Sequence, residues 1–487
     1  MRFILIISDT LRADHLGCYG NKWISTPHID AFARESVVFE NSYCASFPTV
    51  LNRRDLLTGC YTFTYTPWAP MRQEELVLPE MLREAGFVSM MCTDNPHILE
   101  NGYHFDKGFD GFEWIRGQES DRWKTSPSEI SYRCDPSKIR GGTHYLHHRR
   151  NASDWQYESD TFTARTMSAA MRWLEKNSKL EEFFLYVDAF DPHEPWDAPQ
   201  WYVDRYDPNY SGDIVDYPRY DYASYLSKEE LRHCRALYAA EVTLIDRWVG
   251  QLLQKIKDLG LDDNTTVIFT SDHGFLLGEH GIIGKTIIGE DDLQYIPLYE
   301  EINHVPLIVK MPSCKPRRNK ALVQPPDVTA TIVDLSGAPN PGTMDGTSFA
   351  GVLRGEAETH RDFAVSSPSI MGGGSGEASA TVIKEGWAGV ISGKPIPIEP
   401  GYVDRAVDGV SKRFRGRKRP KATIEKVKSF RGETRSRSDL LFRLTDDPEQ
   451  QKDLAENRPD KLEELRNDFV GLLREVETDE RLVEPWL

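Results

Sequence analysis

The sequence predicts an α/β fold built on a doubly wound sheet, because strand-like apolar runs alternate with amphipathic helices. Residues 2–7 and residues 266–270 read as buried parallel strands. A helix is expected over residues 228–259, opened by a capping box between Ser227 and Glu230. The chain has 487 residues, which exceeds a single hydrophobic core, so we expect a main domain and a smaller one.

Polar side chains follow both predicted strands at the point where each strand ends. Asp9 comes after the first strand, and Asp272 and His273 come after the second. Open α/β sheets bind ligands at the carboxyl ends of their strands. A single aspartate after a strand is more often a turn residue, but carboxylates and an imidazole together favour a site for a hard or borderline divalent cation.

The segment Phe47–Arg53 (FPTVLNR) places a hydroxyl and a guanidinium one helical turn apart. Pro48 is expected to open a helix, with Thr49 in its first turn and Arg53 on the same face. The first turn of a helix favours negative charge. A hydroxyl becomes a good nucleophile when a base or a metal ion lowers its proton affinity. The sequence therefore predicts Thr49 as nucleophile and fourth metal ligand, although an arginine at such a place is usually only a solvated charge.

Several segments resemble the sulfatase family of the alkaline phosphatase superfamily, and they extend from the first strand to the last helix. They are SDTLRADHLGCYG from Ser8, TPHID from Thr26, residues 41–59, DPHEPW from Asp191, SDHG from Ser271, GEHG from Gly278 with Gly284-Lys285, and VPLI from Val305. The resemblance implies an alkaline-phosphatase-like doubly wound sheet with a smaller C-terminal α+β subdomain. It also implies metal-dependent hydrolysis of sulfuric or phosphoric esters.

The nucleophile position departs from the family pattern. Type I sulfatases carry a Cys or Ser in a C/S-x-P-x-R signature, and that residue is oxidised to formylglycine. Here Thr49 takes that position and Leu51 replaces the proline, while Cys44 has no arginine four residues after it. An unmodified threonine resembles the phosphodiesterases, nucleotide pyrophosphatases and phosphoethanolamine transferases of the superfamily. It favours phosphodiester or phosphonate monoester hydrolysis. The alternatives are an arylsulfatase or glycan sulfatase, and a catalytically silent anion-binding relative.

The predicted metal ligands also depart from calcium-type sulfatases, which resemble one another in an Asp-Asp pair and an Asp-Asn pair. Here the pairs are Asp9-Thr10 and Asp272-His273. This ligand set is less anionic and softer, so manganese, zinc or iron is as plausible as calcium. A second ion, held with the help of Asp188 and His280, is the alternative to a single ion.

The resemblance implies roles for further side chains. His193 matches a histidine that contacts the ester and can protonate the leaving group, and Lys285 matches a lysine on the non-bridging oxygens. The Lys-Trp-His segment of arylsulfatases is replaced here by TDNPH. Asn95 and His97 in that segment, together with His280, are therefore candidates for contacts to substrate oxygens.

Composition changes divide the chain. We expect a catalytic domain over residues 1–360 and a C-terminal subdomain over 361–487, with a small sheet and a terminal helix. Residues 116–160 are polar, aromatic and rich in histidine, which predicts a substrate loop or pocket wall. Residues 412–421 hold seven basic side chains, read as a solvated loop or, alternatively, as an oligomer contact or anion-attracting rim.

Net charge, apolar runs and cysteine content limit the partners and the cellular compartment that we expect for the protein. A net charge of −17 argues against nucleic acid or an anionic membrane, and no apolar run approaches the ~20 residues that span a bilayer. The first strand leads directly to a predicted ligand, Asp9, so we expect no cleaved signal peptide. Seven cysteines without zinc spacing favour reduced thiols in the cytoplasm. The expected partner is a small anionic ester, and a homo-oligomer is left open.

Overall fold

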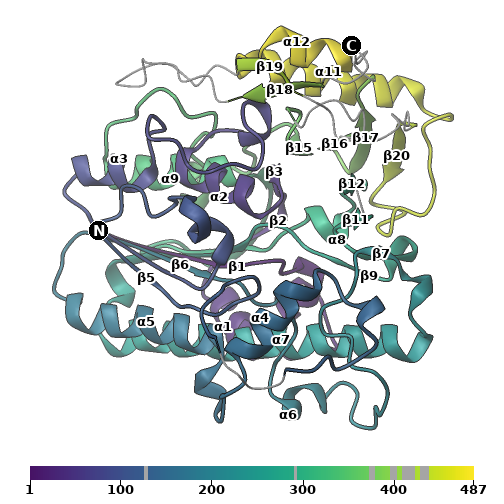
Figure 1. Ribbon diagram of the computed structural model, residues 1–487. Helices are drawn as coiled ribbons and strands as arrows, with labels where there is room; N and C mark the ends of the chain where they lie inside the picture. Colours follow the sequence, from purple (N-terminus) through teal and green to yellow (C-terminus); the bar gives the residue numbers. More distant parts are fainter. Residues whose placement is uncertain (126–129, 290–292, 372–378, 395–402, 408–422, 428–437) are drawn as a thin grey trace. The chain divides into compact units, whose positions relative to one another are not determined.

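The computed structural model of the protein describes residues 1–125, 130–289, 293–371, 379–394, 403–407, 423–427 and 438–487 (Figure 1). It divides into two compact units, each assembled from three chain segments. The first unit is Met1–Glu40, Leu82–Lys285 and Val305–Asn319, and the second is Asn41–Met81, Thr286–His304 and Lys320–Leu487. The division expected near residue 360 stays a prediction. The basic segment 412–421 lies outside the described residues.

The central sheet has eight strands in the order β14-β2-β13-β8-β1-β6-β4-β5. Their bounds are β1 (Arg2–Ser8), β2 (Val37–Ser42), β4 (Val88–Thr93), β5 (Gly111–Trp114), β6 (Phe183–Ala189), β8 (Thr265–Ser271), β13 (Leu307–Lys310) and β14 (Arg317–Val323). The β1 strand pairs in parallel with β6 and β8, whereas β13 is antiparallel to β8 and β2. The predicted α/β class is confirmed, with a mixed sheet.

The register of the two middle strands explains why the predicted ligands lie close together. Ser8 at the end of β1 is paired with Ser271 at the end of β8. The next residues, Asp9 and Asp272, therefore leave the sheet at the same edge. Burial of apolar side chains stabilises both strands, since β1 from Phe3 onward and all of β8 are buried. Each fully buried large aliphatic side chain contributes about 1.5–3 kcal/mol of folding free energy.

Helices of the first unit cover the sheet. Figure 1 shows α5 (Phe162–Asn177) and α7 (Lys228–Asp258) running along the same side of the strands, and α1 (Pro27–Arg34) also packs on α7. The predicted capping box of α7 is confirmed, because the Ser227 hydroxyl accepts from Glu230 N–H while the Glu230 carboxylate accepts from Ser227 N–H. The remaining elements of this unit are α4 (Gly142–Asn151), α6 (Gln200–Val203), β7 (Asp221–Tyr222), β9 (Leu276–Leu277) and β10 (Ile282–Gly284); α3 (Leu78–Glu84) spans the boundary between the units.

The second unit contains a five-stranded sheet in the order β20-β17-β16-β15-β3. The terminal helix α11 (Pro459–Glu475) packs on β16 and β17, and its Leu465 and Phe469 belong to the apolar core there. The subdomain predicted over residues 361–487 stays a prediction, because the sheet also includes β3 (Ser46–Phe47). The elements are β3 (Ser46–Phe47), α2 (Thr49–Thr58), β11 (Thr286–Ile288), β12 (Leu293–Tyr295), α8 (Glu300–Asn303), α9 (Pro325–Ser336), α10 (Ala350–Arg354), β15 (Ala364–Pro368), β16 (Ser379–Lys384), β17 (Trp387–Ser392), β18 (Val403–Val407), β19 (Thr423–Val427), β20 (Leu440–Arg443) and α12 (Glu480–Val483).

The helix α2 begins where the sequence predicts. Pro48 is its N-cap and Thr49 its first residue, and Gly59 ends it in the left-handed conformation with φ of +73°. All ten residues of α2 are buried, including Arg53 one turn after Thr49. The buried carboxylate of Asp55 fixes the helix to β3, because it accepts hydrogen bonds from the backbone N–H and the hydroxyl of Ser46.

None of the helices in the described ranges is both long enough and apolar enough to cross a membrane.

Candidate active site

Three buried side chains at the carboxyl edge of the sheet converge on one point. Asp9, Asp272 and His273 each offer a ligand atom, and these atoms all lie within 4.8 Å of one another. All three residues are fully buried. This is the predicted set of protein ligands, apart from Thr49, and two carboxylate oxygens with one imidazole nitrogen suit a divalent cation.

The ring of His273 is oriented for metal binding through Nε2. Its Nδ1 lies 3.0 Å from the carbonyl oxygen of Gly274. A carbonyl oxygen only accepts, so Nδ1 carries the proton and Nε2 keeps its lone pair. That Nε2 atom lies 3.3 Å from Oδ2 of Asp272, so the ring and the carboxylate present their donor atoms together. The donor set therefore fits the ion that the sequence predicts.

Thr10 supports both carboxylates, a role that sequence reasoning missed. Its hydroxyl donates to Asp9 Oδ1 over 2.7 Å, and its backbone N–H donates to Asp272 Oδ1 over 2.9 Å. The Tyr238 hydroxyl donates to the carbonyl oxygen of Thr10. Thr10 adopts a φ of +62°, a left-handed conformation that is strained for a β-branched residue. These three hydrogen bonds hold it there.

Asn95 lies beside the same carboxylate. Its amide nitrogen is 3.4 Å from Asp9 Oδ2, and its amide oxygen accepts from the backbone N–H of His97, so it caps the short turn Pro96–Ile98. The amide therefore links Asp9 to His97. Its predicted contact to a substrate oxygen stays a prediction.

Lys285 brings positive charge to the ligand cluster. Its ammonium lies 3.2 Å from His273 Nε2 and is buried. Burial lowers the pKa of Lys285 from its ordinary value, although the nearby Asp9 opposes that shift. An anionic substrate at this edge of the sheet would meet this ammonium.

His193 and His97 are close neighbours, with ring centroids 6.5 Å apart, and Phe190 stacks on His193. His193 Nδ1 lies 2.7 Å from the carbonyl oxygen of Glu194. His97 Nε2 lies 3.0 Å from the carboxylate of Glu119. Each of the two rings thus lies against a glutamate.

The two glutamates are joined by Arg140. Its guanidinium donates to Glu119 Oε1 over 2.9 Å and to Glu194 Oε1 over 2.8 Å. It is also flanked by two tyrosine rings, Tyr217 and Tyr220, each with its centroid 4.4 Å from the guanidinium carbon, and their hydroxyls donate to Glu119 and Glu194 respectively. We call Glu119, Arg140 and Glu194 the carboxylate bridge.

Two members of the carboxylate bridge come from the segment 116–160. Sequence reasoning drew attention to its histidines, and the structure gives these histidines unequal roles. His144 is exposed, whereas His148 is buried and accepts from the backbone N–H of Glu119 while its Nε2 lies 2.7 Å from Asp197. The segment also forms the helix α4, which its polar composition did not predict.

Thr49 and Arg53 belong to the second unit, where both are buried in α2. His280 lies half-buried in the first unit, in the turn Glu279–Gly281. Within the described residues, neither His280 nor Asp188 is part of the group that could hold a metal ion. The roles expected of these side chains stay predictions.

A model of the family described as "Sulfatase" matches residues 2–338. The chain belongs to the sulfatase family. The predicted family, and with it the hydrolysis of sulfuric or phosphoric esters, is confirmed. An arylsulfatase of Clostridium perfringens is 24% identical over 413 residues, which cover 74% of this chain and 80% of the relative. An N-acetylglucosamine-6-O-sulfatase of Bacteroides thetaiotaomicron is 23% identical over 438 residues, covering 74% and 72%.

Among solved structures, the phosphonate monoester hydrolase of Agrobacterium radiobacter is similar with a TM-score of 0.68 and 19% identity, over 98% of this chain and 96% of that one. At this identity the likeness supports the fold alone. The predicted alkaline-phosphatase-like architecture is confirmed by it.

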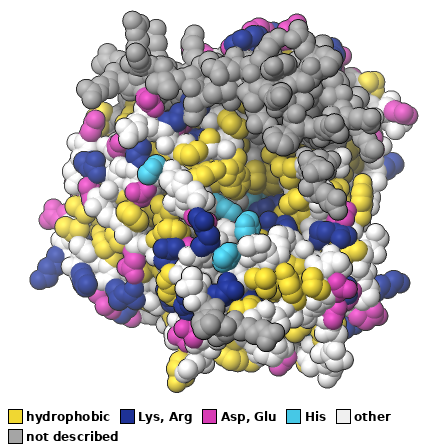
Figure 2. All heavy atoms as spheres, in the orientation of Figure 1, with side chains coloured by type: hydrophobic (Ala, Val, Ile, Leu, Met, Phe, Trp, Pro, Cys, Tyr) yellow, Lys and Arg dark blue, Asp and Glu magenta, His cyan; other side chains and the backbone are white. Residues whose placement is uncertain are grey.

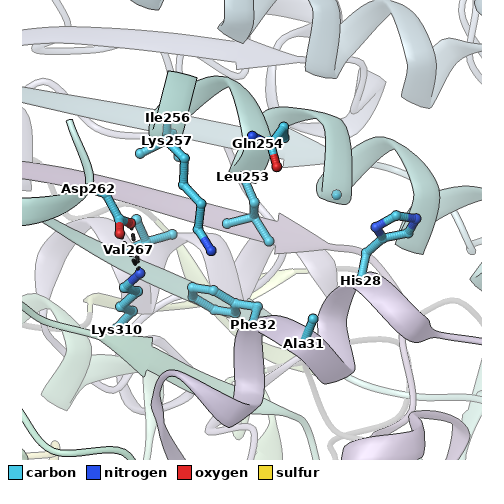
Figure 3. Close-up of a pocket in the computed structure, with 11 residues that line it drawn as sticks. His28, Ala31, Phe32, Leu253, Gln254, Ile256, Lys257, Asp262, Val267 and Lys310 are labelled. Carbon is cyan, nitrogen blue, oxygen red and sulfur yellow. Dashed lines mark hydrogen bonds and ion pairs between the residues drawn. The ribbon is translucent and has the colours of Figure 1, made fainter. Parts of the chain in front are cut away.

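A separate small cavity of about 100 Å³ in this sulfatase-family chain lies between α1, α7 and the amino-terminal half of β8 (Figure 3). Its two lysines are already paired, because Lys310 lies 2.8 Å from Asp262 and Lys257 lies 3.0 Å from Glu35. Because Asp272 follows the other end of β8, this cavity is no part of the ligand cluster.

Imidazole and cationic side chains gather on one face of this sulfatase-family protein. Figure 2 shows histidine side chains gathered with lysine or arginine side chains near the middle of the displayed face. The net charge is −17, so such a cationic group is a local exception on an acidic protein. Local positive charge attracts an anion even where the overall charge repels it.

Proposed function

We propose that the protein hydrolyses a singly charged phosphorus ester, a phosphodiester or a phosphonate monoester, with unmodified Thr49 as the nucleophile. The observation that carries this proposal is the threonine at the place where type I sulfatases have the residue that becomes formylglycine. The first helical position of Thr49 in α2 supports it, since a hydroxyl there sits at the positive end of a helix.

The metal would be held by Asp9, Asp272 and His273, with Thr49 as the fourth ligand. A divalent cation supplies a lowered proton affinity for a coordinated hydroxyl and withdraws charge from the ester oxygens. The mixed oxygen and nitrogen donors suit manganese, zinc, iron or calcium. A second ion would use Asp188 and His280.

The remaining side chains stabilise negative charge, contact substrate oxygens and supply a proton. Arg53 and Lys285 stabilise the negative charge on the equatorial oxygens. Asn95 and His280 contact substrate oxygens. The departing oxygen takes its proton from one of the two adjacent histidines, His193 or His97.

The covalent intermediate on Thr49 can be broken down more easily when it is a phosphorus ester than when it is a sulfate ester. A formylglycine hydrate expels sulfate by breaking its own C–O bond, and a sulfo-threonine has no such exit. A phospho-threonine can be hydrolysed at phosphorus under metal activation. The sulfatase names of the curated relatives favour the second candidate function, sulfate ester hydrolysis.

A panel of four esters tests the proposal: 4-nitrophenyl sulfate, 4-nitrophenyl phosphate, 4-nitrophenyl phenylphosphonate and bis(4-nitrophenyl) phosphate. We expect the two singly charged phosphorus esters to have the highest kcat/KM. Fast turnover of the sulfate with little turnover of every phosphorus ester would contradict the proposal and favour a sulfatase.

We extend the proposal to the cellular compartment of the protein and to the role of residues 116–160. The seven cysteines all lie within the described residues and form no disulfide there, which supports a reducing compartment such as the cytoplasm. Residues 116–160 would form a wall of the substrate pocket through Glu119 and Arg140.

A further inference from the structure

A buried carboxylate holds the helix that carries Thr49. Asp55 lies in α2, six residues after Thr49, and its side chain is fully buried. Its Oδ2 accepts a hydrogen bond from the backbone N–H of Ser46 over 2.7 Å. Its Oδ1 accepts from the Ser46 hydroxyl over 2.7 Å and from the backbone N–H of Thr62 over 2.8 Å. One side chain thus joins α2 to β3 and to the turn that follows the helix.

Ser46 extends this connection to the sheet of the second unit. Its hydroxyl donates to Asp55 and also accepts from the backbone N–H of Phe63 over 2.9 Å. Ser46 is paired in parallel with Ser367 of β15. The carboxylate therefore lies where the helix α2, the edge strand β3 and the turn Thr62–Thr64 meet.

The Asp55 carboxylate is held by neutral donors. Within the described residues it forms no ion pair, and its three hydrogen bonds come from two backbone N–H groups and one hydroxyl. Arg54, its neighbour in α2, pairs with Glu75 at 3.4 Å instead, and Asp327 pairs with Arg361. The charged or titratable side chains on the segments packed around Asp55 are Arg53, Arg54, Tyr61, Asp327, Asp334 and Asp345.

A proton on Asp55 would weaken this connection. All three partners donate, so a hydroxyl on either carboxyl oxygen would face a donor, and at least one of the three hydrogen bonds would be lost. Burial raises the pKa of Asp55 to about 7, although hydrogen bonds from Thr62 and Ser46 oppose the shift. The carboxyl is therefore ionised above about pH 7, and it gains a proton as pH falls through that value.

We propose that ionised Asp55 is a positioning residue that keeps α2 in place for the reaction, and that its protonation loosens the helix and lowers activity. This inference rests on the proposed function, because α2 carries Thr49 and Arg53. Asp55 acts through the helix and not on the ester. The effect on the rate can be large, since a misplacement of about 1 Å can slow a reaction about 10²-fold.

The pH dependence of kcat with 4-nitrophenyl phenylphosphonate tests this coupling. We expect the wild-type kcat to fall between about pH 8 and about pH 6, with an apparent pKa near 7. Ser46→Ala removes one donor to the carboxylate, so it should move this fall upward by about one pH unit. Asp55→Asn should lower kcat about 10²-fold and abolish the fall.

Thr64→Val is the matched control for these variants. It removes a buried hydroxyl of the same turn, which donates to the carbonyl oxygen of Tyr61 over 2.7 Å and does not touch Asp55. Its pH profile should be that of the wild type. A fall in kcat that stays in place in Ser46→Ala, or that persists in Asp55→Asn, would overturn the inference.

Hydrogen–deuterium exchange of the α2 amides tests the helix directly. After correction for the intrinsic pH dependence of exchange, we expect about tenfold weaker protection at about pH 6 than at about pH 8 in the wild type. Asp55→Asn should give weak protection at both pH values, whereas Thr64→Val should behave as the wild type does. Equal protection of wild-type α2 at both pH values would overturn the inference.

The two measurements keep this inference separate from the proposed function. If the wild type prefers sulfates, 4-nitrophenyl sulfate replaces the phosphonate, and the same fall in kcat is expected. If no ester is turned over, the proposed function has failed and hydrogen exchange decides. Protection that depends on pH in the wild type and not in Asp55→Asn supports the role of Asp55, and protection that is independent of pH overturns it.

Discussion

The backbone N–H of Thr10 donates a hydrogen bond to Asp272 Oδ1 over 2.9 Å, although 262 positions separate the two residues in the sequence. The parallel pairing of β1 with β8 makes this contact possible, because both residues come just after the paired strand ends. The same turn places the Thr10 hydroxyl on Asp9. One residue thus holds both carboxylates of the candidate metal site.

The first prediction concerns metal retention. Asp9→Ala and Asp272→Ala should each remove most of the bound metal and all detectable activity, because each deletes a buried carboxylate ligand. Elemental analysis of the purified variants measures this directly. Asp263→Ala is the control, since Asp263 is exposed. A double variant that keeps its full metal content would show that the ion binds elsewhere.

The second prediction concerns Thr10. Thr10→Val keeps the shape of the side chain but removes the hydroxyl that donates to Asp9. Loss of such a supporting hydrogen bond typically weakens metal binding about 10- to 100-fold, which titration of the metal-free protein would measure. Thr10→Ser retains the hydroxyl and should bind within a few-fold of the wild type. Equal metal affinities of Thr10→Val and Thr10→Ser would show that the hydroxyl does not contribute to metal binding.

The third prediction concerns the carboxylate bridge. Arg140→Leu leaves Glu119 and Glu194 buried without their shared cation, which should cost about 3–5 kcal/mol of unfolding free energy at neutral pH. The pKa of Glu119 is depressed below its ordinary 4.5 in the folded protein. Its charge therefore contributes stability above pH 4.5, and this contribution is lost as pH falls through the lowered pKa.

Denaturant titrations of the wild type and Arg140→Leu at several pH values check this. The difference between the two proteins should be largest at neutral pH and should shrink as pH falls below 4.5, because the unfolded chain then binds a proton that the folded wild type excludes from Glu119. Arg122→Leu removes an ion pair whose arginine is 67% exposed, and should cost less than about 1 kcal/mol. A deficit that is independent of pH would mean that lost packing, not charge, explains the effect.

The grouping of Asp9, Asp272 and His273 could be predicted from the sequence because its signal is local. An apolar run ends just before Asp9, and another ends just before Asp272, so the side chains change from apolar to polar within one or two residues. The start of α2 at Thr49 was predictable for the same reason, since Pro48 fixes it. These features need no knowledge of distant partners.

The carboxylate bridge could not be predicted, because no local pattern encodes it. Arg140 contacts Glu194 across 54 positions and Glu119 across 21. Each of the three charged residues, taken alone, is typical of a solvated surface. Only the tertiary fold buries them together, and only the pairing of their charges makes that burial tolerable. The left-handed turn at Thr10 is equally nonlocal, because two of its three stabilising contacts come from distant residues, Asp272 and Tyr238.

The fourth prediction concerns Cys44, the cysteine nearest to the signature segment. Cys44→Ala should leave kcat within about tenfold, a change in barrier of ~1.4 kcal/mol, because Cys44 is not at the nucleophile position. Its thiol is buried and lies 3.4 Å from the amide oxygen of Asn303, so its role is in packing. Mass spectrometry of the wild type should find no formylglycine at this position. Complete loss of turnover in a folded Cys44→Ala protein would overturn the alignment of this segment.

The last prediction concerns the nucleophile itself. Thr49→Ala should lower kcat by several orders of magnitude while metal stays bound, because Asp9, Asp272 and His273 remain as ligands and only the attacking oxygen is lost. Thr49→Ser keeps a hydroxyl and should retain much more activity. Acid quenching of the wild type during turnover of 4-nitrophenyl phenylphosphonate should trap a phosphonylated peptide that contains residue 49, and Thr49→Ala should give none. A Thr49→Ala protein that retains metal and hydrolyses the ester at the wild-type rate would show that water, rather than this side chain, attacks phosphorus.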